Sequence, residues 1–479
     1  MTLARKIAYN TIISTGARII AVSLSLVSIG FIARYLGQEG FGNYSLVLAI
    51  LFTFDILADF GLYSLMVREI SKPKADEKKI ASNIFTIRII AILFFLGLAI
   101  LFVFILPYTS QIRLGVVIGS IGFIFLSSSQ VLMGVFQKYL RTDKPGLADV
   151  IGRIVQVGLV ILFISLDLGF FAIIIALCLG CITNFFFNWF FAQKHIKLSL
   201  SFDFKLWKKI INAAIPIAAS IVLTLVYFKL DTIFLSLKAI NSSSLNPSID
   251  VGIYNISYKI LEGLIFFPAM FTGLIMPLLS KFAFTNKGEF IKIFQKTLDF
   301  LIVLIIPLMI GLLLLSTPIV LLIGGKDFIA SAIVLQILSI AIGLIFLGNL
   351  FGRAIIALDK QKKAAWIYFS GMFFNVITNL IFIPRFSYLG AAITTVFTEL
   401  LVTILMIVLI YKTINYFPSF KIIFKALFAG IIMGLFIFFF QSWNVFLLIV
   451  LGFLIYMIIL YLIKGISKKE IQVLFKKTS

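Results

Sequence analysis

Long apolar runs of about 20 residues alternate along the chain with short polar breaks. A run of this length crosses a ~30 Å hydrocarbon core as an α-helix. A membrane β-barrel would instead show strands that alternate polar and apolar side chains with a period of two. The pattern therefore predicts an all-α, multi-pass membrane protein with about fourteen spans. They cover approximately residues 8–33, 44–66, 83–107, 113–137, 147–166, 169–192, 212–236, 251–279, 297–316, 330–357, 364–384, 388–411, 422–440 and 444–463.

Three short motifs recur in the same order, at a nearly constant offset along the chain. The pairs are "EGFGNYSL" (39–46) with "DVGIYNIS" (250–257), "TDKPG" (142–146) with "LDKQK" (358–362), and "DLGFFA" (167–172) with "YLGAAI" (388–393). They predict a duplicated six-helix unit whose copies share one orientation, as in the parallel repeats of some transporters. The expected domains are an N-lobe at 1–197, an interfacial linker helix and C-lobe at 198–415, and two last helices with a cytoplasmic tail at 416–479.

Composition agrees with this pattern, and charge adds an orientation. The 479 residues are 62% hydrophobic, and the formal net charge is +22. Of the 41 Lys and Arg, 31 lie in or beside the segments on one face, five lie on the opposite face, and five lie inside spans. Basic residues mark cytoplasmic loops, so both termini are expected in the cytoplasm, with the protein in the cell membrane. Topology thus accounts for the charge, and no nucleic-acid partner is needed.

The stretch between the predicted halves, 198–216, has an amphipathic pattern. Leu206, Trp207, Ile210 and Ile211 share one face, and Lys205, Lys208 and Lys209 lie on the other. This pattern is typical of a helix that lies in the membrane interface. A plain extension of the span at 212–236 is the alternative.

Most enzyme classes are excluded by what the chain lacks. No HExxH, GxSxG, phosphate-binding loop or paired-carboxylate spacing occurs, and the longest break on the outer face, about 237–250, is too short for a catalytic domain. We therefore expect a transporter with no catalytic residue, no metal site and no cofactor.

Ionisable side chains inside predicted spans are the candidate functional residues, because charges within a membrane usually face a cavity or a partner. Arg18, Arg88 and Arg153 are candidates for binding a diphosphate, since arginine stays charged and binds phosphate through two donors. Arg18 could instead pair with Asp55 or Asp59, while Arg88 and Arg153 lie shallow enough to reach headgroups. The candidates for lining the cavity or coupling are Asp55, Asp59, Gln156, Asp231, Lys259, Glu262, Asn375, Asn379 and Glu399. Lys259 and Glu262 could simply pair with each other.

Several stretches resemble a known family. They include "ARYLGQEGFGNYSLVLAI" (33–50), "DFGLYSLMVREIS" (59–71), "IPIAASIVLTLVYFKLDTIFL" (215–235), "VGIYNISYKILEGLIFFPAMFTGLIMPLLSK" (251–281) and "FNVITNLIFIPRFSYLGAAITTVFTEL" (374–400). The chain is similar to the Wzx-type O-antigen and polysaccharide flippases of the multidrug/oligosaccharidyl-lipid/polysaccharide exporter superfamily. The resemblance implies twelve core helices in two lobes plus two more. It also implies translocation of an oligosaccharide linked to an isoprenoid diphosphate, such as undecaprenyl diphosphate, from the cytoplasmic to the outer leaflet.

Two relatives of the same superfamily remain as alternatives, a lipid II flippase and a cation-coupled multidrug exporter. A membrane-embedded polymerase or ligase would need a large external loop, and a structural scaffold would need no intramembrane arginines. The expected partners are the lipid-linked oligosaccharide, membrane lipids and polysaccharide polymerase machinery. The transport could be coupled to protons, sodium ions or the membrane potential.

Overall fold

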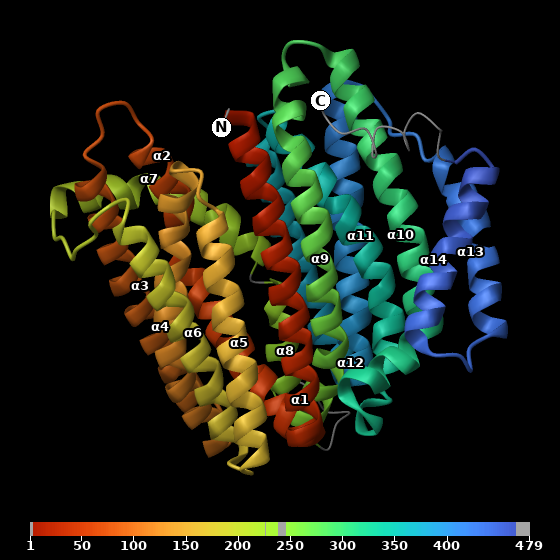
Figure 1. Ribbon diagram of the computed structural model, residues 1–479, viewed down its shortest axis with the longest axis horizontal. Coiled ribbons are helices and arrows are strands. Elements are labelled where there is room, and N and C mark those ends of the chain that lie inside the picture. The colour runs from red at the N-terminus through yellow and green to blue at the C-terminus, as the bar shows by residue number, and fades with distance from the viewer. Residues whose placement is uncertain (1–2, 226, 238–245, 466–479) are drawn as a thin grey trace. The chain divides into compact units, whose positions relative to one another are not determined.

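The computed structural model describes residues 3–225, 227–237 and 246–465, and the regular structure of these residues is helical, with no strand (Figure 1). This confirms the all-α prediction. The chain divides into two compact units. Unit 1 comprises Met1–Asn255 and Ile323–Gly325, and unit 2 comprises Ile256–Leu322 and Lys326–Ser479. The domain boundaries predicted at 197 and 415 stay predictions.

Unit 1 is a bundle of helices joined by short turns. Its elements are α1 (Leu3–Asp59), α2 (Leu62–Ile70), α3 (Glu77–Ile105), α4 (Ser110–Lys138), α5 (Asp143–Ser165), α6 (Gly169–Gln193), α7 (Phe204–Leu225), α8 (Tyr227–Ser236) and the beginning of α9 (Pro247–Ala283). A buried apolar cluster joins α2, α3, α4 and the neighbouring ends of α6 and α7. Packing of Leu62, Leu65, Met66 and Ile70 into this cluster fixes where α2 lies.

The long helix α1 contains the first two predicted spans. Gly37 interrupts it with φ 66° and ψ −175°, a conformation that glycine adopts at little cost because it has no Cβ. The N-terminal end of α1 and the short helix α2 both lie at the upper end of unit 1 in Figure 1. The chain therefore runs down the bundle before Gly37 and returns after it.

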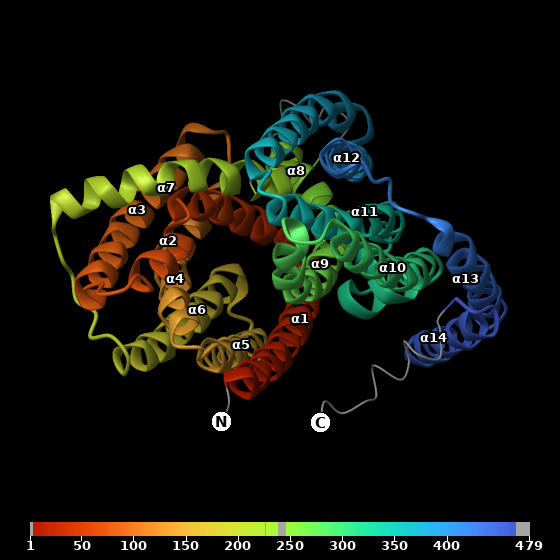
Figure 2. The same ribbon diagram turned by 90° about the horizontal axis from the view of Figure 1, so that it is seen from above.

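Helices α7 and α8 share the seventh predicted span. The structure describes helix over Phe204–Leu225 (α7) and over Tyr227–Ser236 (α8), on either side of residue 226. The two views show α7 crossing the end of unit 1 at the level of α2 instead of running along the bundle (Figures 1 and 2). The amphipathic stretch at 204–211 forms the first turns of α7, and its three lysines are exposed. Its place in the membrane interface stays a prediction.

The segment before α7 is held to α3 by a row of polar contacts. Asn83, fully buried, accepts hydrogen bonds at its Oδ1 from the backbone N–H of Asp203 at 2.9 Å and from Nε1 of Trp207 at 2.8 Å. The Nδ2 group of Asn83 donates to Oγ of Ser201 at 3.0 Å, and the N–H of Ser201 donates to Thr86 at 2.9 Å. The backbone N–H groups of Ser201 and Asp203, which an exposed loop would leave to water, therefore donate to side chains of α3.

Unit 2 contains the rest of α9, followed by α10 (Lys287–Gly324) except for its last two residues, η1 (Lys326–Phe328), α11 (Ser331–Ala357), α12 (Gln361–Ile414), α13 (Lys421–Phe439) and α14 (Val445–Leu462). Helix α12 holds the eleventh and twelfth predicted spans and reverses at Ser387, where φ is 49° and ψ is −127°. A Cβ on Gly390 would lie 2.4 Å from the carbonyl oxygen of Phe382. This turn is tight enough to require glycine.

Within the described residues, eleven helical stretches are long and apolar enough to cross a membrane. Helices α1 and α12 each contain two predicted spans, and α7 with α8 covers the one remaining predicted span. The prediction of about fourteen helices is therefore confirmed.

The internal repeat has a structural counterpart at its turns. Leu140, just before the first copy of the second repeated motif, and Asp359, inside the second copy, both have positive φ shortly before a new helix. Asp167 and Ser387, at or just before the two copies of the third repeated motif, both have a φ of 49° shortly before a glycine. The chain thus turns sharply near both copies of each motif.

The first repeated motif forms a reciprocal contact within unit 1. A Cβ on Gly42 would lie 1.7 Å from the carbonyl oxygen of Ser248, and a Cβ on Gly252 would lie 2.2 Å from that of Gln38. Gly42 and Gly252 hold the same position in the motif, and Gln38 and Ser248 each lie one helical turn before the glycine of their own copy. Each copy thus contacts the other through equivalent atoms, which is the relation that a local two-fold axis produces.

Candidate functional site

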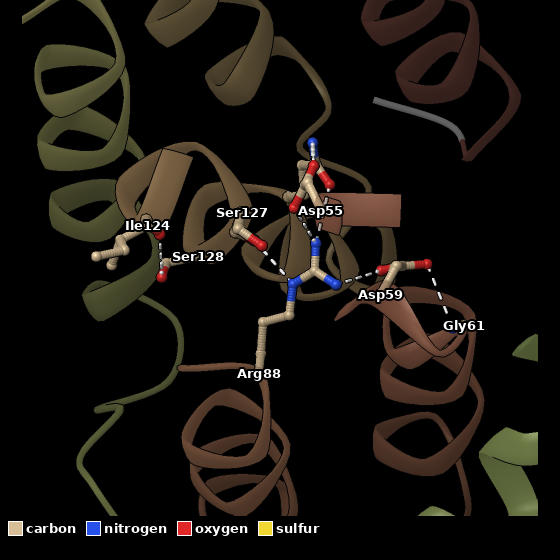
Figure 3. Close-up of polar contacts among 8 residues, drawn as sticks. Asp55, Asp59, Gly61, Arg88, Ile124, Ser127 and Ser128 are labelled. Carbon is tan, nitrogen blue, oxygen red and sulfur yellow. Dashed lines mark hydrogen bonds and ion pairs between the residues drawn. The ribbon is translucent and has the colours of Figure 1, made fainter. Parts of the chain in front are cut away.

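Arg88 of α3 lies in a buried ion network at the junction of α1, α3 and α4 (Figure 3). Its side chain has no exposed surface. Nη2 is 3.1 Å from Oδ1 of Asp55, and Nη1 is 3.2 Å from Oδ1 of Asp59. Nε donates to the carbonyl oxygen of Ser127 at 3.3 Å, and Nη2 also donates to Oε1 of Gln130 at 3.1 Å. One guanidinium therefore holds three helices together.

The two carboxylates of this network are held from the other side as well. Nε2 of Gln130 donates to Oδ2 of Asp55 at 3.3 Å, and the N–H of Gly61 donates to Oδ2 of Asp59 at 3.3 Å. Phe60 and Gly61 both have positive φ, which turns the chain sharply between α1 and α2 and leaves Asp59 beside Arg88. The Asp59-Phe60-Gly61 motif thus forms the turn that places the Asp59 carboxylate beside Arg88. The headgroup-anchor interpretation of Arg88 is wrong for this conformation, because the side chain reaches no surface of the unit.

Arg18, Asp149 and Arg153 form a second, exposed charge cluster on α1 and α5. Nη1 of Arg18 is 3.2 Å from Oδ2 of Asp149, and Nε of Arg153 is 3.8 Å from Oδ1 of the same carboxylate. Their side chains are 52%, 24% and 32% exposed in that order. Arg18 pairs with Asp149 and not, as one interpretation of the sequence expected, with Asp55 or Asp59, because Arg88 already contacts those two acids.

Close packing of α1 on α5 brings this cluster together. A Cβ on Gly146 would lie 3.0 Å from Cβ of Ala17 and 3.6 Å from Cα of Ser14. Gly146 therefore allows the helices to approach one turn away from Asp149. Gln156, 5% exposed, accepts a hydrogen bond of 2.9 Å from Nη1 of Arg153 and so fixes that side chain from its own helix.

The charges of these three groups do not cancel. Two guanidinium groups share one carboxylate, which gives the cluster a net charge of +1, and both guanidinium groups are partly exposed. Fixed guanidinium groups bind the oxygens of a phosphate through paired hydrogen bonds. The arrangement is suited to binding an anion that replaces Asp149 as the shared partner.

Asp231, the candidate on α8, lies in a separate buried group formed with the first turns of α9 in unit 1. Asp231, 2% exposed, accepts a hydrogen bond of 3.0 Å from the hydroxyl of Tyr254. Asn255 Nδ2 donates to Oγ1 of Thr232 at 3.2 Å and to the carbonyl oxygen of Val251 at 2.9 Å. Tyr254 is the tyrosine of the repeated Gly-x-Tyr motif, so that motif packs a hydroxyl against a buried acid.

The remaining candidates lie in unit 2 and fall into two places. Nζ of Lys259 is 2.7 Å from Oε2 of Glu262, so these two residues do pair on one helix. Asn375 donates to Oγ1 of Thr398 at 3.4 Å and accepts a 3.0 Å hydrogen bond from Asn379, which links the two halves of α12. Glu399, 4% exposed, follows Thr398 on the second half.

Sequence reasoning missed part of this site. Gln130, Ser127 and Asn83 have structural roles that their spacing does not reveal, and Asp149 was not among the candidate site residues. No group of three or more His, Cys, Asp or Glu in the part of the chain that the structure describes is placed to hold a metal ion.

Comparison with known proteins agrees with this fold. The family described as "Polysaccharide biosynthesis protein" matches residues 7–283. The probable low-salt glycan biosynthesis flippase Agl15 of Haloferax volcanii is 25% identical over 395 residues, which cover 81% of this chain and 80% of that protein. The capsular polysaccharide biosynthesis protein CapF of Staphylococcus aureus is 24% identical over 387 residues, 80% of this chain and 94% of that protein.

Two solved structures show how widely the fold is shared. The lipid II flippase MurJ in an inward closed conformation superposes with a TM-score of 0.79 at 17% identity, over 94% of this chain and 98% of that one. An inward-facing multidrug transporter of the MATE family and MOP superfamily superposes with a TM-score of 0.67 at 14% identity, over 85% of this chain and 98% of that one. Since the family match covers more than half of the sequence, this multi-pass membrane chain belongs to the polysaccharide biosynthesis protein family.

Proposed function

We propose that this protein is a flippase that moves an oligosaccharide linked to an isoprenoid diphosphate from the cytoplasmic to the outer leaflet of the cell membrane. Its family and its two glycan-biosynthesis relatives support the substrate class. The observation that carries the proposal is the exposed Arg18–Asp149–Arg153 cluster with its net positive charge. A lipid-linked sugar has its negative charge at the diphosphate, while its sugars vary and its tail is hydrocarbon.

The proposed step at this cluster is an exchange of anions. Without substrate, Asp149 neutralises part of the charge that would otherwise make two arginines costly inside a membrane. The diphosphate takes over the donors of Arg18 and Arg153, the second of which Gln156 keeps in place. Alternating access of the two predicted lobes would then carry the polar head across while the tail stays in lipid.

Arg88 has a different place in the proposal. Its role as a diphosphate ligand stays a prediction, since in the conformation described its partners enclose the guanidinium. We assign the Asp55–Arg88–Asp59 network to holding α1, α3 and α4 in register within unit 1. Coupling to protons, sodium ions or the membrane potential stays a prediction, with the buried acids Asp231 and Glu399 as its candidates. Cytoplasmic termini and a polysaccharide polymerase partner stay predictions too.

A lipid II flippase is the second candidate, favoured by the superposition on MurJ. Lipid II also carries a diphosphate, so the Arg18 cluster fits both substrates. The family match favours the polysaccharide substrate, and transport of the two lipids by the same preparation distinguishes them.

Binding of geranyl diphosphate, a short soluble isoprenoid diphosphate, tests the cluster directly. We expect Arg18→Ala to weaken binding to the purified protein at least tenfold, because a hydrogen bond to a charged group is worth ~1.5–3 kcal/mol. Arg18→Lys should recover only part of the loss, since an ammonium cannot make the paired contact. Asp149→Asn should tighten binding, because it removes the competing carboxylate. Isothermal titration of each variant gives these affinities.

Arg68→Ala is the matched control, because Arg68 is 54% exposed on α2 and lies outside the cluster. Its affinity for geranyl diphosphate should equal that of the unchanged protein. An Arg18→Ala variant that binds as well as Arg68→Ala, or an Asp149→Asn variant that binds more weakly, would contradict the assignment of the diphosphate to this cluster.

A further inference from the structure

Helix α7 has an amphipathic pattern, and the proposed diphosphate cluster makes no use of it. It crosses the end of unit 1 beside α2 and contacts α1, α2 and α3 (Figure 2). One face of its first turns is buried, with Ile210 3% exposed and Ala214 1% exposed. Lys205, Lys208 and Lys209 are exposed on the other side. A helix with this division lies at the boundary between headgroups and acyl chains.

Beneath α7 is an apolar pocket of about 350 Å³. All ten residues that line it are aliphatic or aromatic. They come from α3, from α7 and from the junction of α1 and α2, and include Ile87, Ala91, Phe94, Trp207, Ile211 and Ala214. Phe94 is 62% exposed and Ile211 is 41% exposed, so the pocket opens sideways on the surface of the unit. This lining offers no charged group that would bind a phosphate.

Positive charge lies on the same helix as the wall of this apolar pocket. Lys208 follows Trp207, and Lys205 lies one turn before Lys208. Asp203, the nearest acid in the sequence, is paired with Lys79 at 2.8 Å, and the hydrogen bond from Lys79 lowers the pKa of the Asp203 carboxyl. This acid is therefore already neutralised, and the exposed lysines keep a net positive charge on the helix that supplies Trp207, Ile211 and Ala214 to the pocket.

We infer that this pocket binds an anionic phospholipid of the surrounding membrane, with one acyl chain against Trp207 and Ile211 and the phosphate at Lys205 and Lys208. Basic residues beside an apolar surface attract anionic lipids. Asn83 holds Trp207 through its indole N–H, so the wall of the pocket is fixed before a lipid arrives.

Two features favour a phospholipid over the isoprenoid tail of a transport substrate. The volume of about 350 Å³ suits part of one acyl chain, whereas an isoprenoid tail is long and branched. Three of the lining residues also belong to α7, the helix with the exposed lysines, and none belongs to α5, where Arg18 meets Asp149. The lipid is then a fixed part of the structure and not cargo.

Quenching by brominated lipid tests this site, because Trp207 is in its wall. Trp207 is kept as the single tryptophan by changing Trp189, Trp366 and Trp443 to Phe, and the protein is reconstituted in phosphatidylcholine with a small fraction of brominated phosphatidylglycerol. We expect Trp207 to be quenched several-fold more than random mixing allows. The same fraction of brominated phosphatidylcholine should give only the random value. A second variant that keeps only Trp366, 72% exposed in unit 2, is the control and should show random quenching.

Substitutions test the lysines and the apolar pocket separately, with the enrichment of brominated phosphatidylglycerol at Trp207 as the measurement. Lys205→Glu and Lys208→Glu should each lower the enrichment about fivefold, as expected for a basic residue next to an anionic leaflet. Lys362→Glu, an exposed lysine of α12, should have no effect. Ala91→Phe should fill the pocket and abolish the enrichment while the emission of Trp207 without brominated lipid stays unchanged. Equal quenching of Trp207 by the two brominated lipids would overturn the inference. Loss of the enrichment on adding equimolar undecaprenyl phosphate would also overturn it, since the occupant would then be an isoprenoid.

Discussion

Arg88→Met is expected to destabilise the protein by about 3–5 kcal/mol, because it leaves two acids in a buried network without their cation. Asp55 is 3% exposed and lies under the side chain of Gln130, so water cannot take the place of the guanidinium. Thermal unfolding of the purified protein, followed by tryptophan fluorescence, measures the change. Removing all three charges in Arg88→Met with Asp55→Asn and Asp59→Asn should recover much of the stability, because uncharged groups of similar volume need no partner charge.

Arg68→Met is the matched control for this experiment. Arg68 is 54% exposed and pairs with its neighbour Glu69, and exposed ion pairs contribute about 0–1 kcal/mol. Its unfolding temperature should stay near that of the unchanged protein. If Arg88→Met and Arg68→Met unfold at the same temperature, the network does not hold α1, α3 and α4 together.

Gly42→Val is expected to remove the conformation described here and to lower transport at least tenfold. The contact with the carbonyl of Ser248 is backbone to backbone, so no side chain can move aside. The two segments must separate until the approach of 1.7 Å becomes an ordinary contact of 3.4–4 Å. Gly252→Val should have the same effect through Gln38. Spin labels on Glu39→Cys and Ile249→Cys, with Cys178 and Cys181 changed to Ala, report the separation.

Gly97→Val is the control, because a Cβ at Gly97 on α3 would meet nothing within 4 Å. It should leave both the label distance and transport unchanged. An unchanged distance in the Gly42→Val protein would show that the reciprocal contact is not needed for this conformation.

Hydropathy predicts the number and order of the helices well, because each span must satisfy its backbone hydrogen bonds internally. It fails where length and direction depend on packing. Helix α7, which begins before the span expected at 212–236, turns across the end of unit 1 because its apolar face packs on α2 and α3. The repeat was readable because its glycines are required by tight contacts, as at Gly42 and Gly252.

The partners of the charged residues could not be predicted from one sequence. Arg88 and Asp55 are 33 residues apart, and Arg18 and Asp149 are 131 apart. Periodicity shows which face of a helix a charge lies on, but it does not show which helix faces it. The sequence therefore identified the arginines and the acids as candidates and left their pairing open, and the structure sorts them into a buried network and an exposed cluster.

Flipping of a lipid-linked oligosaccharide by the purified protein in liposomes tests the central claim most directly. The substrate is an isoprenoid-diphosphate oligosaccharide with a fluorescent label. An added reductant bleaches only the label on the outer face of the liposome, so the fraction of fluorescence lost measures how much substrate has changed leaflet. We predict protein-dependent flipping that Arg18→Ala reduces at least tenfold and Arg68→Ala leaves unchanged, with lipid II flipped more slowly than the oligosaccharide substrate. Flipping no faster than in protein-free liposomes, or flipping of the oligosaccharide that is unaffected by Arg18→Ala, would contradict the account.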